Sequence, residues 1–188
     1  MKRSSIAMSL VWLLILAAGC SPRATSFVNS NVDFSYIRRV AIFPLQNLSS
    51  DHKAPARVGS IFLAELLEQD GIEVLAPGET ISGLVAMNLS AAEVLSQDQI
   101  VELGKRLEVD ALFFGSVEEY GIEQMGRDRA FGITVSFSMA ETTTGQLIWN
   151  AQTHRGGISL WRKVFGGGTP EPYEVSRSAV RDALETLF

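Results

Sequence analysis

Few side chains in this sequence have the chemistry that catalysis or metal binding needs. Cys20 is the only cysteine, and His52 and His154 are the only histidines. The two histidines stand far apart in the chain and lack the close spacing of metal-ligand motifs. No GxSxG or HExxH pattern occurs, and no histidine stands near Cys20 to activate its thiol. We therefore predict no enzyme activity, no metal site and no cofactor.

Glu118 and Glu119 are the remaining candidates for chemistry, as a carboxylate pair that could share acid–base work. Both fall in a segment predicted as a strand, where neighbouring side chains point to opposite faces. That alternation predicts that the two carboxylates are kept apart. Glu118 and Glu119 are therefore not expected to act as a catalytic pair.

The thiol of Cys20 has a better use as an attachment point for lipid. A basic start with Lys2 and Arg3 precedes an apolar run over residues 6–18, which is too short for a comfortable membrane span. The run ends in LAAGC, which resembles a bacterial lipobox, so residues 1–19 are predicted to be a signal peptide and Cys20 to carry acyl chains. The alternative is an ordinary signal peptide that leaves an incidental free thiol.

Ser21 predicts the destination of the lipidated chain. In lipoproteins with this motif, an aspartate after the cysteine is the main signal for retention in the inner membrane. Serine in that place predicts anchoring in the outer membrane, facing the periplasm. Residues 20–35 are polar and without a helix pattern, so they are predicted to be a lipidated tether before a single globular domain over 36–188.

A second membrane contact is predicted in a loop near the carboxyl end. Two glycines precede and three follow an apolar and basic tip over residues 158–165. Aromatic side chains beside cationic ones suit a membrane–water interface. The predicted membrane-contacting residues are Leu160, Trp161, Arg162, Lys163 and Phe165. The alternative is an ordinary loop whose Trp161 folds back onto the core.

The charge balance argues against nucleic-acid binding. The formal net charge is −5, and removing residues 1–19 makes it −7 because Lys2 and Arg3 leave. No basic stripe offsets this. The acidic surplus predicts either attraction of a cationic partner or nothing more than solubility.

The hydrophobic pattern predicts a mixed α/β (α+β) fold, with a five-stranded mixed sheet and helices on its faces. The element order is β-α-β-α-α-β-β-β-α. The predicted strands cover residues 39–45, 72–75, 111–124, 131–139 and 146–153. The predicted helices cover residues 55–69, 79–89, 97–107 and 173–188. Residues 131–139 alternate strictly, which indicates a half-buried antiparallel strand.

Several segments in this order resemble the CsgG-like and TolB-N-terminal-like lipoprotein domains. They are VAIFPLQNLSSD (40–51), GIEVLAP (71–77), ELGKRLEVDALFFGSVEEYG (102–121) and TTTGQLIW (142–149). The resemblance covers nearly all of the chain after the leader. It implies a non-catalytic periplasmic domain that assembles or docks.

Within that family, the nearest resemblance is to PelC-type lipoproteins of exopolysaccharide export. The resemblance implies a homo-oligomeric ring, an outer-membrane porin partner and a cationic polysaccharide. The alternative is an LpoB-like regulatory module that activates a cell-wall synthase. Such a module must reach across the envelope, whereas residues 21–35 extend over at most about 50 Å. The short tether favours work close to the membrane.

Overall fold

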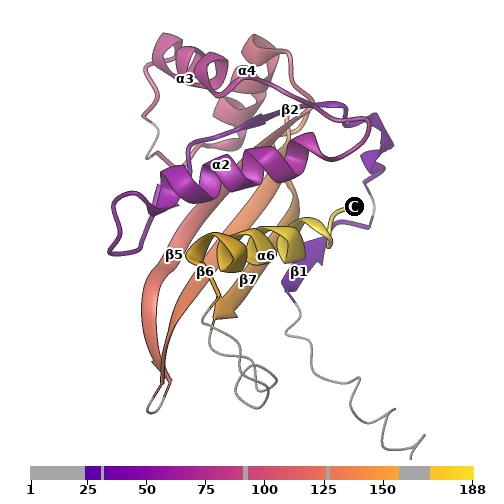
Figure 1. Cartoon of the computed structure of the whole chain (residues 1–188). Helices are drawn as coiled ribbons and strands as arrows, with labels where there is room; N and C mark the ends of the chain where they lie inside the picture. Colours follow the sequence, from indigo (N-terminus) through magenta and orange to yellow (C-terminus); the bar gives the residue numbers. More distant parts are fainter. Residues whose placement is uncertain (1–23, 31, 91–92, 126–127, 157–169) are drawn as a thin grey trace, which may run out of the picture.

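The computed structural model describes residues 24–30, 32–90, 93–125, 128–156 and 170–188. Within them, seven strands form one mixed sheet in the order β1-β7-β6-β5-β2-β4, and β3 pairs with β5 (Figure 1). The strands are β1 (Thr25–Val28), β2 (Arg39–Ile42), β3 (Gln46–Asn47), β4 (Glu73–Val74), β5 (Ala111–Met125), β6 (Asp128–Glu141) and β7 (Leu147–Gly156). The α-helices are α2 (Ala54–Leu67), α3 (Pro77–Ala86), α4 (Gln97–Leu107) and α6 (Pro172–Leu184), and η1 (Phe34–Tyr36) is a 3-10 turn.

Three long antiparallel strands, β5, β6 and β7, form the body of the sheet. In strand β6, apolar residues alternate with small polar residues without a break, which is the pattern of a strand with one buried face. Its apolar side chains are buried on one face: Phe131, Ile133, Val135, Phe137 and Met139. The predicted half-buried strand over 131–139 is therefore confirmed.

Strand β2 is parallel to both of its main neighbours, β4 and β5. Parallel strands need crossover connections, and here α2 leads from β3 to β4 while α3 and α4 lead from β4 to β5. The apolar run of β2 places Val40 in the cluster under α2 and Ala41 in the cluster under α3 and α4. This strand is therefore covered on both faces, as its continuous apolar run suits.

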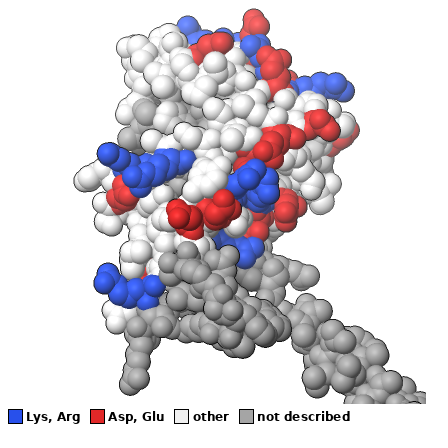
Figure 2. Space-filling model, in the orientation of Figure 1, with Lys and Arg blue, Asp and Glu red and all other residues white. Residues whose placement is uncertain are grey.

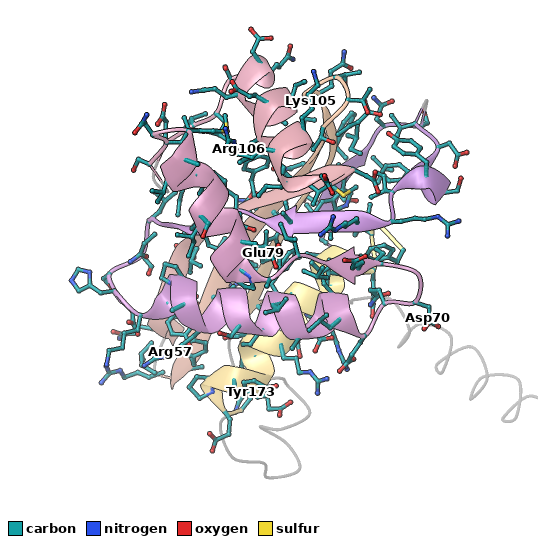
Figure 3. All side chains as sticks on the ribbon, turned by 90° about the horizontal axis from the view of Figure 1, so that it is seen from above. Arg57, Asp70, Glu79, Lys105, Arg106 and Tyr173 are labelled. Atoms are coloured by element: carbon teal, nitrogen blue, oxygen red, sulfur yellow. The ribbon has the colours of Figure 1, made fainter. Side chains whose placement is uncertain are left out.

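The helices cover the two faces of the sheet unequally. Helices α2 and α6 lie along one face, and α3 and α4 lie on the opposite face, beside β2 (Figures 1 and 3). The cluster beneath α2 and α6 is the larger of the two cores. Within the described residues, no helix covers the second face over the middle and lower parts of β5, β6 and β7 (Figure 1).

Aromatic rings fill the larger core. Phe62 of α2 stacks on Phe137 of β6, with ring centroids 4.4 Å apart, and meets Phe113 of β5 edge-on at 5.3 Å. Trp149 of β7 is fully buried and lies edge-on to Phe113 at 6.0 Å. Its indole nitrogen donates to the Thr186 hydroxyl at 2.9 Å, so the ring is fixed between the sheet and the end of α6.

The predicted class and the order of the predicted elements are confirmed, but the sheet has two strands more than the five predicted. Strand β3 has only two residues, too few for a sequence pattern. Strand β1 lies inside the segment predicted as a tether, and it pairs antiparallel with β7 from Thr25 to Val28. All four of its side chains are exposed, so main-chain pairing holds it and hydrophobic periodicity could not reveal it.

The start of α4 and the buried face of α2 agree with the sequence pattern to different degrees. Helix α4 begins at a capping box that is readable in the sequence: Ser96 accepts from the Gln99 main chain, and Gln99 accepts from that of Ser96. In α2, the apolar residues Val58, Ile61 and Phe62 recur with helical spacing and are buried, whereas the side chain of Leu67 is exposed. Leu67 is the last residue of α2 and lies outside the buried face of that helix.

No helix among the described residues is both long and apolar enough to span a bilayer.

A buried carboxylate joins α2 to α6. Glu65 of α2 accepts hydrogen bonds from Arg177 at 2.5 Å and Arg181 at 2.6 Å, and both arginines also reach Glu68 at 3.2 Å. Burial alone would raise the pKa of Glu65, but the bonds from Arg181 and Arg177 outweigh burial and hold that pKa below its ordinary value. Asp182 of α6 forms a further ion pair with Arg155 of β7.

We predict that Glu65→Gln destabilises the protein by about 2 kcal/mol at pH 7, less than for a fully buried pair because both arginines keep contact with water. A lowered folded-state pKa contributes stability above the ordinary glutamate pKa of about 4.3, and this contribution is lost as pH falls through the lower value. Urea unfolding at pH 7 and pH 3 should therefore show the gap to the wild type narrowing in acid. The matched control Glu68→Gln, at an exposed position, should cost under about 0.5 kcal/mol; equal losses in both variants would contradict this account.

Candidate functional site on the open face of the sheet

The uncovered part of the second face, called the open face below, is lined by small polar side chains. They come from alternate positions of three adjacent strands, so they form rows across the sheet. The residues of the open face are Ser116, Thr134, Ser136, Ser138, Asn150, Gln152 and His154. A sheet that turns apolar residues to helices on one side and polar residues outward on the other can bind a ligand or a second copy across that outer side.

A β-bulge brings two acidic side chains onto the open face. The register of β5 against β6 shifts between Val117 and Glu119, so alternation breaks at Glu118. Glu118 accepts a hydrogen bond from Gln152 at 2.8 Å, and Glu119 accepts one from Thr134 at 2.6 Å. The prediction that these carboxylates lie on opposite faces is therefore wrong, because an extra residue in a bulge resets the alternation.

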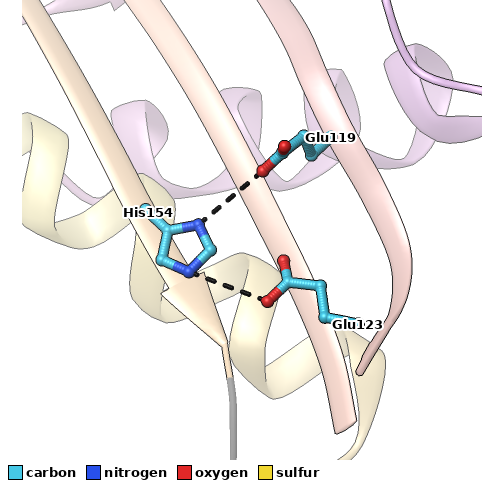
Figure 4. Close-up of side chains that lie close together, drawn as sticks. All are labelled: Glu119, Glu123 and His154. Carbon is cyan, nitrogen blue, oxygen red and sulfur yellow. Dashed lines mark ion pairs between the residues drawn. The ribbon is translucent and has the colours of Figure 1, made fainter. Parts of the chain in front are cut away.

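Below the bulge, Glu119, Glu123 and His154 form a second group on the open face (Figure 4). His154 Nδ1 lies 3.9 Å from a Glu119 oxygen, and its Nε2 lies 3.8 Å from a Glu123 oxygen. Sequence reasoning missed this group, since β7 carries the histidine and β5 the glutamates. The recurrence of Glu at positions 119 and 123, on one face of a strand, was the only available signal.

At the other end of the open face, next to α4, lies a cavity of about 300 Å³. Its apolar wall includes Phe43, Leu95, Ile100 and Phe114, and its polar wall carries the row Ser116, Ser136 and Ser138. Val94 and Leu147 also line it, and both side chains are largely exposed. The open face thus runs from a partly apolar hollow to an acidic lower end.

The face formed by α2 and α6 differs from the open face. Figure 2 shows basic and acidic side chains interspersed over it, with no large area of one sign. The ion pairs of Glu65 and Glu68 with Arg177 and Arg181 lie between these two helices. The described part of this face therefore ties α2 to α6, and its acidic side chains are interspersed with basic ones.

The residues predicted for lipidation and membrane contact lie outside the described part of the chain: Cys20, Leu160, Trp161, Arg162, Lys163 and Phe165. These predictions stay predictions. The other histidine, His52, is exposed in the loop before α2. Among the described residues it belongs to no cluster of potential metal ligands.

No family model matches this sequence, and no curated protein sequence is significantly similar to it. Solved structures are similar. The PelC dodecamer from Paraburkholderia phytofirmans superposes with a TM-score of 0.58 and 17% identity, over 86% of this chain and 94% of that chain. This chain has the fold of PelC. The predicted resemblance to the CsgG-like lipoprotein fold is thereby confirmed.

Two further structures extend the comparison. Lipoprotein GNA1162 from Neisseria meningitidis matches with a TM-score of 0.58 and 16% identity, over 79% of this chain and 99% of that chain. The hypothetical protein CT253 from Chlamydia trachomatis matches with a TM-score of 0.54 and 12% identity, over 80% and 95% respectively. The fold is thus shared with PelC and with a lipoprotein from another organism, and at these identities the comparisons show the fold alone.

Proposed function

We propose that this chain is an outer-membrane-anchored lipoprotein that faces the periplasm and forms a homo-oligomeric ring. In this proposal it is a non-catalytic subunit of an exopolysaccharide export apparatus of the Pel type. The observation that carries the proposal is the match to the PelC dodecamer, which covers nearly the whole of both chains. The lipobox-like sequence that ends at Cys20 supports the anchor.

The start of β1 bears on how far the domain could stand from the membrane. Because Thr25 already pairs with Gln152 of β7, the chain from Cys20 to Thr25 spans at most about 18 Å when fully extended. A lipid on Cys20 would then hold the sheet close to the bilayer. This supports a ring at the membrane over the alternative, an LpoB-like regulatory module that activates a cell-wall synthase across the envelope.

The open face offers a surface for the proposed cationic polysaccharide. Its acidic end carries Glu118, Glu119 and Glu123, while the α2–α6 face mixes both signs (Figure 2). Opposite charge would attract and guide a cationic polymer towards an outer-membrane porin. The membrane-contact tip around Trp161 would add a second attachment at the inner leaflet of the outer membrane.

The lipidated chain in detergent should assemble into a defined oligomer, which light scattering after gel filtration and native mass spectrometry can measure. In this proposal the polar row Ser116, Ser136 and Ser138 meets the neighbouring subunit, while the acidic end of the open face meets the polymer. Ser136→Arg should therefore lower the assembled fraction at least tenfold, because it places a long charged side chain within the polar row. Ser60→Arg on the exposed face of α2 is the matched control and should assemble normally. A lipidated sample that stays monomeric at high concentration would contradict the ring and favour the regulatory module.

A further inference from the structure

The group of Glu119, Glu123 and His154 has a donor set suited to a metal ion. One ligand atom from each residue lies within 4.8 Å of the other two (Figure 4). An imidazole nitrogen with carboxylate oxygens is a common ligand set for zinc and related divalent ions. Ligands of one tetrahedral zinc ion stand about 3.4 Å apart. The remaining gap can close by side-chain rotation, because His154 is 54% and Glu119 65% exposed.

Hydrogen bonding at Thr134 occupies one ring nitrogen of His154 and leaves the other to bind a ligand. The Thr134 hydroxyl donates to Glu119, which as a carboxylate can only accept, and the same oxygen lies 3.0 Å from His154 Nδ1. With its one proton committed, Thr134 accepts from Nδ1–H. His154 Nε2 then faces Glu123, whose nearest oxygen is 3.8 Å away, and it is the ring nitrogen at which a metal ion could take the place of a proton. A hydrogen-bond partner on one ring nitrogen, as Thr134 is for Nδ1, typically orients a histidine that binds a metal through the other nitrogen.

The backbone around Glu123 is shaped to hold its carboxylate in place. A Cβ at Gly132 of β6 would lie only 1.8 Å from Glu123 Oε1, and one at Gly156 of β7 would lie 3.0 Å from Oε2. The two glycines thus leave the space that the carboxylate fills. Glu123 Oε1 is fully buried and has no hydrogen-bond partner among the described residues. A buried carboxylate oxygen without a partner is costly, and a cation at this carboxylate would offset that cost.

No lysine or arginine of the described residues forms an ion pair with Glu119 or Glu123. Among the described residues, the two carboxylates therefore have only His154 as an ion-pair partner, and a metal ion between the three side chains would take the place of the proton that makes the ring a cation. We propose that Glu119, Glu123 and His154 bind a divalent transition-metal ion of the zinc class, which links β5 to β7 across β6. Bound metal would neutralise the acidic end of the open face and tie together strands that otherwise meet only through β6 and its glycines.

The test is zinc chloride titration by calorimetry of the full chain in detergent, in a Cys20→Ala background that removes the only thiol. We expect one zinc ion per chain, with affinity at least tenfold weaker in Glu123→Gln and in His154→Ala. The matched controls are Glu118→Gln and His52→Ala, and both should bind zinc normally. Glu118 is a neighbouring carboxylate on the same face, where it accepts a hydrogen bond from Gln152. Glu123→Gln keeps the side-chain volume, and His154 is exposed, so both variants should fold; thermal unfolding in EDTA checks this.

A second readout separates this site from a general attraction of cations. Zinc should raise the melting temperature of the parent protein and leave that of His154→Ala unchanged, because binding to the folded state alone stabilises it. Magnesium at the same concentration should have no effect, since it prefers oxygen ligands. The proposal is overturned if no zinc binds, if His154→Ala binds zinc as tightly as the parent, or if magnesium stabilises the protein as much as zinc does. None of these results depends on ring formation.

Discussion

Replacing Cys20 by alanine should remove the protein from the outer membrane almost completely. A lipid chain contributes about 0.8 kcal/mol per buried CH₂ group, and dual or triple acylation gives stable anchoring. Without the thiol no lipid can be attached, so the variant should appear as unprocessed precursor or as soluble protein. Fractionation of the envelope on a density gradient, followed by immunoblotting, measures this.

A change at the next residue provides the matched control for Cys20→Ala. Ser21→Asp keeps the lipid and alters only the residue predicted to govern sorting, so the protein should stay membrane-bound but move to the inner-membrane fraction. If Cys20→Ala still sediments with the outer membrane, then Cys20 is an incidental thiol and the anchor lies elsewhere.

Two tryptophans should respond to substitution in opposite ways. Trp149 is fully buried, lies against Phe113 and donates a hydrogen bond to Thr186. Trp149→Ala should therefore cost about 3–5 kcal/mol of unfolding free energy, or roughly 10 °C in melting temperature for a chain of this size. Trp161→Ala, in the proposed membrane-contact tip, should change stability by under about 0.5 kcal/mol.

Membrane binding should show the reverse order for these tryptophans. Burial of one indole at an interface is worth about 2 kcal/mol, and repetition around a ring multiplies it through effective concentration. Trp161→Ala should weaken liposome binding of the lipid-free oligomer, and Arg162 and Lys163 should matter more at low salt because each adds about 1 kcal/mol near anionic lipid. A large loss of stability with intact liposome binding would instead place Trp161 in the core.

The elements with strong periodicity were predictable from the sequence. The alternation of residues 131–139 has period two, and the apolar positions of α2 recur with helical spacing, so each pattern identifies its element and its buried face without knowledge of any partner. The Ser96–Gln99 capping box likewise depends only on residues three apart. Local patterns report local structure, which is why these predictions were confirmed.

The missed features depend on contacts between distant segments. Strand β1 exists because its main chain pairs with β7, and no property of its own four exposed side chains requires a strand. The bulge at Glu118 arises in the pairing of β5 with β6, and it decides that two neighbouring glutamates share a face. Rules based on sequence alone assume unbroken alternation and fail at that point.

The candidate sites also differ in whether the sequence alone predicts them or the folded structure is needed. The lipobox at Cys20 and the glycine-flanked Trp161 tip are contiguous motifs, so the amino-acid sequence alone was enough to propose an anchored envelope protein. The group of Glu119, Glu123 and His154 needed the folded sheet, because strand pairing aligns β5, β6 and β7 and places a histidine from one strand beside glutamates from another. Gly132 then leaves room for the Glu123 carboxylate, a steric requirement that exists only once the strands lie side by side.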